Sequence, residues 1–260
     1  MYLVKKFPYR IIVVKIAVIT PYHDATRKFL DRCIDSVRNQ TTACRHYLIA
    51  DGPSSICQCT TELLDVARHV VLGECHNDHG NTPRGIGALL AISEGADAIC
   101  FLDPDNLYDS NHVETCATLA EKHPGVDFIA ARRRIVLPDG TPVPGEDEPN
   151  HVDTSCFFLL PGAFHILPQQ VLQPKQLCTV SDRLFLAALQ GLRCIAMDRP
   201  TVTYTSNWRA HYEAAGVEPP SDAKGTIYID KLMNWWRGLT PMERAISLRR
   251  LGLKHLWGNA

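Results

Sequence analysis

The chain of 260 residues has no excess of either charge sign. Lys and Arg together number 27 and Asp and Glu number 28, which gives a formal net charge of −1. Nucleic-acid-binding domains usually carry a strongly basic face. The balance therefore argues against a nucleic-acid partner, while the length suffices for one large domain or for two lobes around one sheet.

Long uninterrupted hydrophobic runs are also lacking. The most apolar early stretch, residues 11–19, contains Lys15 and is too short to cross a bilayer. Lys5 and Lys6 precede it as in a signal peptide, but no small-residue cleavage site follows. We therefore expect a cytoplasmic protein without a membrane span.

The ten cysteines lack the spacing of a disulfide framework or a zinc knuckle. Five of them lie within apolar patterns: Cys33, Cys100, Cys116, Cys156 and Cys194. Such residues behave as small buried hydrophobes, so the sequence predicts reduced thiols and no disulfide. One local cluster combines cysteine with histidine: Cys44, His46, Cys57, Cys59, Cys75 and His76. Its spacing does not favour a zinc site.

An apolar run from Ala98 to Leu102 leads directly into Asp103-Pro104-Asp105. The short unbroken run predicts a central strand that is covered on both faces. Ligands of open α/β sheets bind beyond the carboxyl ends of the strands. In extended backbone Asp103 and Asp105 project to the same side, where a hard divalent cation would neutralise them. The alternative interpretation is a turn, since Asp-Pro-Asp-Asn is good turn chemistry.

Strand and helix patterns alternate before this motif, which predicts an α/β fold with a mostly parallel central sheet. The predicted strands are 15–20, 47–50 and 70–72, and the predicted helices follow residue 24, include 63–67 and begin at 82. Pro21 should end the first strand because it cannot continue a ladder. Thr82 should cap the third helix, with Pro83 at its first position and residues 86, 89, 90 and 93 on one face.

Gly85 and Gly87 lie in the first turns of that third helix, although glycine is a poor helix former. Close packing against the sheet is one explanation. The other is that they leave room for a ligand above the start of the helix.

Periodicity is weaker in the second half but still predicts further elements. These are a helix with capping-box spacing at 111–114, strands at 126–131, 155–160 and 194–197, a helix over 181–191, loops at 138–150 and 216–225, and a terminal helix over 241–251.

Polar side chains follow the predicted strand ends repeatedly, and together they describe a site for a nucleoside diphosphate. Asp51 could accept a hydrogen bond from a base or sugar edge, and the carboxylate pair supplies a metal site. Arg84 lies at a helix start, which attracts phosphate.

The order and spacing of several segments resemble family 2 glycosyltransferases, which have the GT-A fold. The matching segments are Cys33-Ile34-Asp35-Ser36-Val37-Arg38-Asn39-Gln40-Thr41, Ala50-Asp51-Gly52-Pro53-Ser54, Pro83-Arg84-Gly85-Ile86-Gly87, and Gly95 to Asp105 with the DxD motif. The resemblance implies a GT-A domain with a nucleotide-sugar-binding half over 1–110, an acceptor-binding and catalytic half over 111–215, and a C-terminal helical extension over 216–260.

For the donor nucleotide, the resemblance implies that Thr20, Pro21 and Tyr22 wall the base. Asp51 would bind uracil or its equivalent. Ala50 replaces the first acid of the family's Asp-Asp-Gly-Ser turn, and this leaves the identity of the base open.

For the diphosphate and sugar, the resemblance places Arg84 near the nucleotide and Asp103 at the ribose and donor sugar. Asp105 would ligate Mn²⁺ or Mg²⁺. His211, a late histidine as some GT-A enzymes use, would be a further metal ligand, although a histidine beside aromatic residues more often packs.

The family's catalytic base matches Asp182 in Val180-Ser181-Asp182, at the start of a predicted helix. A carboxylate there can deprotonate an acceptor hydroxyl, and one displacement inverts the anomeric centre. The purely structural interpretation of Asp182 is an acid that stabilises the first helical turn. Asp153 is a competing candidate for the base. The Gln-x-x-Arg-Trp motif of processive members is lacking, which favours transfer of a single sugar.

The sequence therefore predicts a non-processive hexosyltransferase that uses a nucleotide-sugar donor, most simply a UDP-sugar. The acceptor stays open among saccharides, lipid-linked sugars and proteins, and the oligomeric state is open as well. Two alternatives remain: a nucleotidyltransferase acting on sugar phosphates, although no Gly-rich loop follows the first strand, and a catalytically silent relative.

The C-terminal segment carries Trp235, Trp236 and a basic, apolar helix after Pro241. We expect this helix to pack on the catalytic lobe. The alternative is a weak peripheral contact with an anionic membrane.

Overall fold

The computed structural model describes residues 14–23, 27–53, 67–145, 151–225 and 229–256. One sheet runs through the molecule in the order β3-β2-β1-β4-β7-β6-β8-β5. Its strands are β1 (Ile16–Tyr22), β2 (Cys44–Ala50), β3 (Arg68–Val71), β4 (Ala98–Phe101), β5 (Leu107–Tyr108), β6 (Phe128–Val136), β7 (Phe157–Leu159) and β8 (Cys194–Thr205). Neighbours pair in parallel from β3 to β4 and between β6 and β8, whereas β7 and β5 run antiparallel to their neighbours. The predicted mostly parallel α/β sheet is confirmed.

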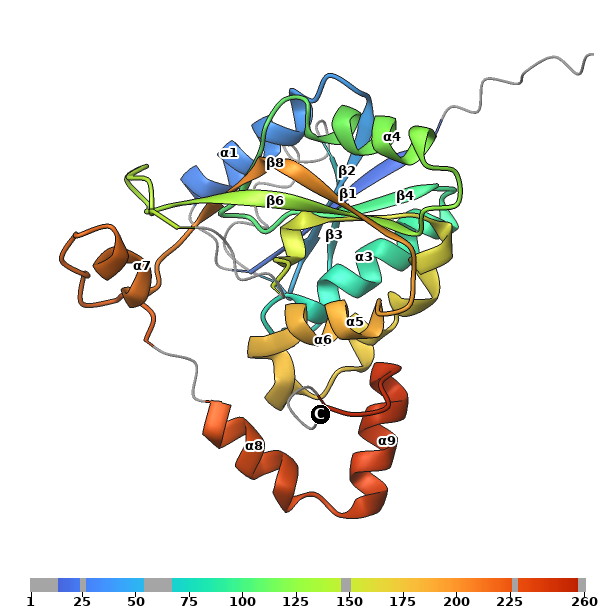
Figure 1. The fold of residues 1–260 in the computed structure, drawn as a ribbon, viewed down its shortest axis with the longest axis vertical. Coiled ribbons are helices and arrows are strands. Elements are labelled where there is room, and N and C mark those ends of the chain that lie inside the picture. Colours follow the sequence, from blue (N-terminus) through green and yellow to red (C-terminus); the bar gives the residue numbers. More distant parts are fainter. Residues whose placement is uncertain (1–13, 24–26, 54–66, 146–150, 226–228, 257–260) are drawn as a thin grey trace, which may run out of the picture.

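Helices cover both faces of this sheet (Figure 1). The helical segments are α1 (Arg27–Arg38), α3 (Asn81–Ser93), α4 (His112–Lys122), η2 (Thr154–Cys156), η3 (Pro161–Ile166), α5 (Gln169–Leu172), η4 (Lys175–Val180), α6 (Ser181–Ala188), α7 (Arg209–Ala214), α8 (Ile229–Gly238) and α9 (Pro241–Leu251). Apolar residues of α1 and α4 pack on one face of the sheet, and those of α3 and α6 pack on the other. Because both faces are buried, the central strands are apolar throughout rather than alternating.

The first strand continues through Pro21 to Tyr22, so the expectation that Pro21 ends it is wrong. Pro21 pairs with Ile49 of β2 in the parallel register. On the other side, β1 and β4 pair only as far as Ile19, whose carbonyl accepts a hydrogen bond from the backbone N–H of Leu102. Pro21 therefore lies beyond the end of β4, where β1 is effectively an edge and tolerates a residue without an N–H.

The start of α3 differs from the expected cap. Gly80 is the N-cap, in the left-handed conformation, and Thr82 lies inside the first turn. The carboxylate of Asp78 caps this turn, since it accepts hydrogen bonds from the backbone N–H of Thr82 at 2.9 Å and from its hydroxyl at 2.6 Å. The face with residues 86, 89, 90 and 93 is not the buried one, because Leu89 is exposed.

Small residues form the buried face of α3. Gly87 lies so close to the sheet that a Cβ atom would approach side-chain carbons of Ile19 and Ile49 to 2.6 and 2.7 Å. Gly85 lies equally close to Val171 of α5. Close packing therefore accounts for both glycines, and this packing brings the start of α3 onto the edge of β1 and β4.

We expect Gly87→Ala to lower the free energy of unfolding by about 1–3 kcal/mol, the usual cost of overpacking, despite the better helix propensity of alanine. Urea denaturation followed by circular dichroism measures this difference. Gly238→Ala in α8, where a Cβ would have open space, is the matched control and should be neutral or stabilising. A neutral Gly87→Ala would contradict the packing argument.

Helix caps elsewhere agree only in part with the sequence. The terminal helix α9 has the predicted capping box between Thr240 and Glu243. At α4 the predicted capping box is wrong: Asn111 makes no side-chain cap, and Glu114 instead accepts a hydrogen bond from the hydroxyl of Thr41 at 2.8 Å.

The C-terminal helices α8 and α9 form a hairpin below α5 and α6 in the view of Figure 1. Trp236 and Leu251 from this hairpin are buried against Leu177, Val180 and Leu184 of η4 and α6. The expected packing on the catalytic lobe is therefore confirmed. Within the described ranges, no helix combines the length and the apolarity that a membrane span requires.

Four of the five cysteines that were expected to be buried are buried, and the fifth, at the start of β8, is not. Cys33, Cys100, Cys116 and Cys156 are buried, whereas Cys194 is exposed. The predicted helix around 63–67 and the cysteines at 57 and 59 lie outside the described residues, apart from residue 67, as does the predicted cap at residue 24.

Candidate functional site

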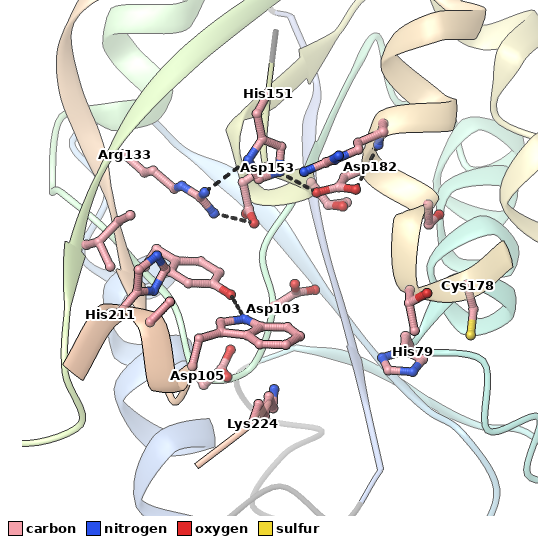
Figure 2. A pocket seen from close by; sticks show the side chains of 18 of the residues that line it. His79, Asp103, Asp105, Arg133, His151, Asp153, Cys178, Asp182, His211 and Lys224 are labelled. Atoms are coloured by element: carbon pink, nitrogen blue, oxygen red, sulfur yellow. Dashed lines mark hydrogen bonds and ion pairs between the residues drawn. The ribbon is translucent and has the colours of Figure 1, made fainter. Parts of the chain in front are cut away.

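Two adjoining cavities open at the carboxyl edge of β1 and β4. Their volumes are about 790 and 420 Å³, and His79, Asp103, Asp105 and Lys224 line both of them. Figure 2 shows Asp103 and Asp105 in the middle of the larger cavity, with His211 to one side and His79 and Cys178 to the other. Residues that are distant in the sequence therefore meet where an α/β sheet is expected to bind its ligand.

The DxD segment forms both a turn and a site. The backbone N–H of Asn106 donates to the carbonyl of Asp103 at 3.0 Å, as the turn interpretation requires. The buried Asn106 side chain then anchors the turn, since it donates to the Ser155 hydroxyl at 3.0 Å and accepts from the Thr205 backbone at 2.9 Å. The turn is thus fixed from below, and both carboxylates line the cavity.

The two carboxylates differ in how they are neutralised. Asp103 accepts a hydrogen bond from the buried guanidinium of Arg84 at 2.6 Å. Burial and the neighbouring Asp103 carboxylate raise the pKa of Asp105 to about 7, although Lys224 works in the opposite direction. The ionised form of Asp105 therefore has too little positive charge around it, and a divalent cation would supply the missing charge.

The residues present fit a cation only in part. Across the described ranges, no three His, Cys, Asp or Glu side chains are arranged to hold a metal ion. His211 lines the larger cavity, where its Nδ1 is hydrogen-bonded to the Ser206 hydroxyl at 2.5 Å, but it does not form a three-ligand cluster with the aspartates. Asp105 with Asp103 would hold Mn²⁺ or Mg²⁺ if phosphate oxygens supply further ligands, which is usual for such ions.

The smaller cavity is bounded by Pro21 and Tyr22, two of the three residues that the family resemblance places at the base. The hydroxyl of Tyr22 is hydrogen-bonded to Nε2 of His69 at 2.5 Å, and the two rings stack. Thr20 lies elsewhere: its side chain is fully buried, and its hydroxyl is 2.8 Å from Nε2 of His46. Thr20 therefore supports the floor of the site and lines neither cavity.

Asp51 lines the smaller cavity but is strongly engaged by the protein itself. Its carboxylate accepts hydrogen bonds from the backbone N–H groups of His76 and Asn77 at 2.9 and 3.0 Å, and Nδ1 of His76 lies 2.9 Å away. Burial alone would raise the pKa of Asp51, but these hydrogen bonds hold it below its usual value. Asp51 therefore shapes the loop at 75–77 as well as facing the cavity.

Both candidate bases line the larger cavity. Asp182 lies in the first turn of α6, and its carboxylate accepts hydrogen bonds from Nε2 of His151 at 2.6 Å and from the backbone N–H of Arg183 at 2.7 Å. Asp153 is bound by the guanidinium of Arg133 at 2.8 Å and by the backbone N–H of Ser155 at 2.9 Å. The exposed fraction of the side chain is 23% for Asp182 and 11% for Asp153, so Asp182 is the more accessible.

Sequence reasoning missed several lining residues, among them Arg133, His151, Tyr204 and Lys224. Arg133 follows the end of the strand predicted at 126–131, whereas β6 extends to Val136. Lys224 lies in the segment interpreted as a linker, yet Trp208 and Lys224 form a parallel β-bridge. Arg133 faces the site, whereas Arg134 pairs with Asp109 outside it. A strand predicted as far as residue 136 would have placed these two neighbours on opposite faces, because side chains alternate along a strand.

The sequence matches the model of the family described as glycosyl transferase family 2 over residues 17–178. The match covers more than half of the chain and includes most of β1, the DxD segment and the chain as far as Cys178. The chain therefore belongs to glycosyltransferase family 2, and it is a glycosyltransferase of the GT-A fold. A search of curated proteins found no match.

Solved structures share the fold at low sequence identity. S. aureus TarS 1–349 in complex with UDP-GlcNAc is similar at a TM-score of 0.60 and 14% identity, over 92% of this chain and 72% of that one. The TarS 1–349 complex with UDP has a TM-score of 0.57 and 16% identity, over 77% of this chain and 63% of the TarS chain. The mannosyltransferase PcManGT from Pyrobaculum calidifontis, in complex with GDP-Man and Mn²⁺, has a TM-score of 0.51 and 10% identity. The match covers 76% of this chain and 59% of that one. In another TarS structure the match spans only 38% of the TarS chain.

Proposed function

We propose that this protein transfers a single hexose from a nucleotide-sugar donor, most simply a UDP-sugar, to a hydroxyl group of an acceptor. Transfer inverts the anomeric centre and is assisted by Mn²⁺ or Mg²⁺. The observation that carries the proposal is the meeting of Asp103, Asp105 and Asp182 around one cavity.

In this proposal the two cavities hold different parts of the substrates. Pro21 and Tyr22 would enclose the base in the smaller cavity, with Asp51 at its polar edge. Arg84 already holds Asp103 at the junction, where the ribose and diphosphate would lie. The donor sugar and the acceptor hydroxyl would then share the larger cavity, on the side of Asp182.

The chemistry needs a base on one side of the anomeric carbon and positive charge on the other. The Asp182 carboxylate accepts the proton of the acceptor hydroxyl as that oxygen bonds to the anomeric carbon. The bond from the anomeric carbon to the diphosphate breaks at the same time. A cation bound by Asp105 and Asp103 would supply Lewis-acid stabilisation of the leaving diphosphate.

We propose Lys224 as a source of positive charge at the diphosphate. It lines both cavities, its Nζ lies 5.7 Å from the centre of the Trp208 ring, and its backbone N–H donates to the carbonyl of Asn207 at 2.7 Å. The side chain is thus fixed at its base and near its tip, at the junction where the phosphates would lie.

We expect Lys224→Met to weaken UDP binding about tenfold, the size of a charge-assisted hydrogen bond of about 1.4 kcal/mol or more. Isothermal calorimetry at low and high salt measures the loss, which should shrink as salt rises. Lys122→Met, at an exposed position at the end of α4, is the matched control. Unchanged UDP affinity in Lys224→Met would remove Lys224 from the donor site.

A donor panel tests the proposed function. UDP-glucose, UDP-galactose, UDP-N-acetylglucosamine and GDP-mannose are each incubated with the protein and Mn²⁺, and release of nucleoside diphosphate is measured alongside the melting temperature. We expect one donor to raise the melting temperature by mass action and to be hydrolysed slowly with water as acceptor. Pyrophosphate release from a nucleoside triphosphate and a sugar phosphate would instead indicate a nucleotidyltransferase, and binding without turnover would indicate a silent relative.

A further inference from the structure

Two side chains, Arg133 and His151, join the two candidate bases into one chain of contacts. Arg133 of β6 binds the Asp153 carboxylate through Nη1 at 2.8 Å, and its Nη2 lies 3.4 Å from Nδ1 of His151. Nε2 of His151 lies 2.6 Å from Oδ2 of Asp182 on α6. Figure 2 shows Arg133, Asp153, His151 and Asp182 along one wall of the cavity. The contacts therefore run Asp153–Arg133–His151–Asp182 between segments that are far apart in the sequence.

The order of donors and acceptors in this chain determines the tautomer of His151. A guanidinium has five N–H donors and no acceptor, so Nη2 of Arg133 can only donate to Nδ1 of His151. Nδ1 must then carry no proton. The ring hydrogen lies on Nε2, which donates to the carboxylate of Asp182. A ring protonated on both nitrogens would direct a second N–H at the Arg133 guanidinium.

We propose that His151 is a positioning residue: Arg133 fixes it as the Nε2–H tautomer, and its single N–H orients Asp182 and keeps that carboxylate ionised for proton abstraction. This inference rests on the proposed function, because it assigns His151 to the same catalytic base. With Nδ1 facing Arg133 and Nε2 already protonated, His151 has no nitrogen left to accept the substrate proton. The ring therefore orients the base and does not relay its proton.

The surroundings of this chain of contacts shift the pKa values of the two carboxylates in opposite directions. Burial would raise the pKa of Asp182, but the hydrogen bond from His151, together with the backbone N–H and the charge of Arg183, holds it below its usual value. For Asp153, burial raises the pKa more than Arg133 lowers it, and Asp103 and Asp182 add to the rise. The network therefore favours an ionised Asp182 next to an Asp153 that ionises less readily, a pattern that assigns acid and base roles to neighbouring carboxylates.

The tautomer can be tested without any substrate. Protein labelled with ¹⁵N in its histidine rings is examined by long-range ¹H–¹⁵N correlation at neutral pH, and the His151 signals are identified by their loss in His151→Gln. We expect a neutral ring with hydrogen on Nε2. Replacement of Arg133 by Met should release this preference, whereas Arg134→Met, on the same strand but paired with Asp109 outside the cavity, should not. A ring protonated on Nδ1 or on both nitrogens in the wild type would overturn the inference.

Kinetics test the positioning role. Nucleoside diphosphate release is followed from pH 4 to 9 with the donor that the panel identifies. His151→Ala should lower kcat about tenfold, leave the KM for donor unchanged and move the acid limb of the profile to higher pH, because Asp182 loses the hydrogen bond that lowers its pKa. His151→Gln retains an N–H donor near the position of Nε2 and should restore most of kcat and the limb. His165→Ala, at an exposed histidine outside both cavities, is the control.

The outcomes separate this inference from the proposed function. An unshifted acid limb in His151→Ala, or a His151→Gln as impaired as His151→Ala, overturns the positioning role while the enzyme still turns over its donor. If instead Asp182→Asn retains full activity, the assignment of the base itself fails, and with it the reason for orienting Asp182.

Discussion

Replacement of Asp105 by asparagine is expected to abolish the metal-dependent part of UDP binding and to lower turnover by at least about 10²-fold, the usual loss when one stabiliser of transition-state charge is removed. Asp105 lines both cavities and has the carboxylate whose pKa rises to about 7. Asparagine keeps the size of the side chain but loses its charge. Titration of the variant with UDP, with and without Mn²⁺, by isothermal calorimetry measures the loss.

The same variant should fold at least as well as the wild type. In the absence of metal, the folded pKa of Asp105 lies near 7, above the 3.8 of an unperturbed aspartate. The native state therefore binds more protons than the unfolded state between about pH 4 and 7, so its free energy of unfolding falls as the pH rises through that window. Asp105→Asn removes this loss, and in EDTA at pH 8 its melting temperature should equal or exceed that of the wild type.

Asp198→Asn is a suitable control for the Asp105 experiment, because Asp198 is exposed on β8 and lines neither cavity. It should leave both UDP binding and the metal dependence unchanged. Wild-type affinity for UDP with Mn²⁺ in Asp105→Asn would remove Asp105 from the metal site, whereas a loss of folding would show that its carboxylate is needed by the structure.

The parts of this molecule that the sequence predicted are those with a short-range pattern. The run from Ala98 to Leu102 is apolar because β4 is covered on both faces, and the polar residues that follow it lie at the ligand-binding edge for the same topological reason. Thr240 and Pro241 predicted the start of α9 to the residue because a capping box is complete within four positions. Such features need no knowledge of the rest of the chain.

Prediction failed where a distant partner decides the outcome. Pro21 continues β1 because β4 ends beside it. Glu114 does not cap its own helix, because its carboxylate accepts a hydrogen bond from the hydroxyl of Thr41. Arg133 enters the site because β6 continues to pair with β8 as far as Val136, with register shifts between Ala130 and Arg133. None of these partners has a signal near the residue concerned, so Arg133 became visible as a lining residue only in the structure, whereas Asp153, Asp182 and His211 had already been named from the sequence.

The second large effect concerns the catalytic base. We expect Asp182→Asn to leave donor binding nearly intact and to lower turnover by about 10²–10⁴-fold, the usual contribution of a general base. Asp182 is the more exposed of the two candidates and accepts hydrogen bonds from His151 and the Arg183 backbone. These contacts fix both carboxylate oxygens in orientation. Calorimetric donor affinity and single-turnover kinetics on the same sample separate binding from chemistry.

Asp153→Asn is the matched comparison, because Asp153 lines the same cavity but is bound by Arg133. Removal of its charge leaves the buried guanidinium without its carboxylate partner, so we expect a lower melting temperature together with a smaller loss of turnover than in Asp182→Asn. If Asp182→Asn stays within a few-fold of the wild type while Asp153→Asn loses turnover at unchanged donor affinity, the roles are reversed. Asp182 would then only stabilise the first turn of α6, and Asp153, whose pKa burial raises, would be the group that takes the acceptor proton.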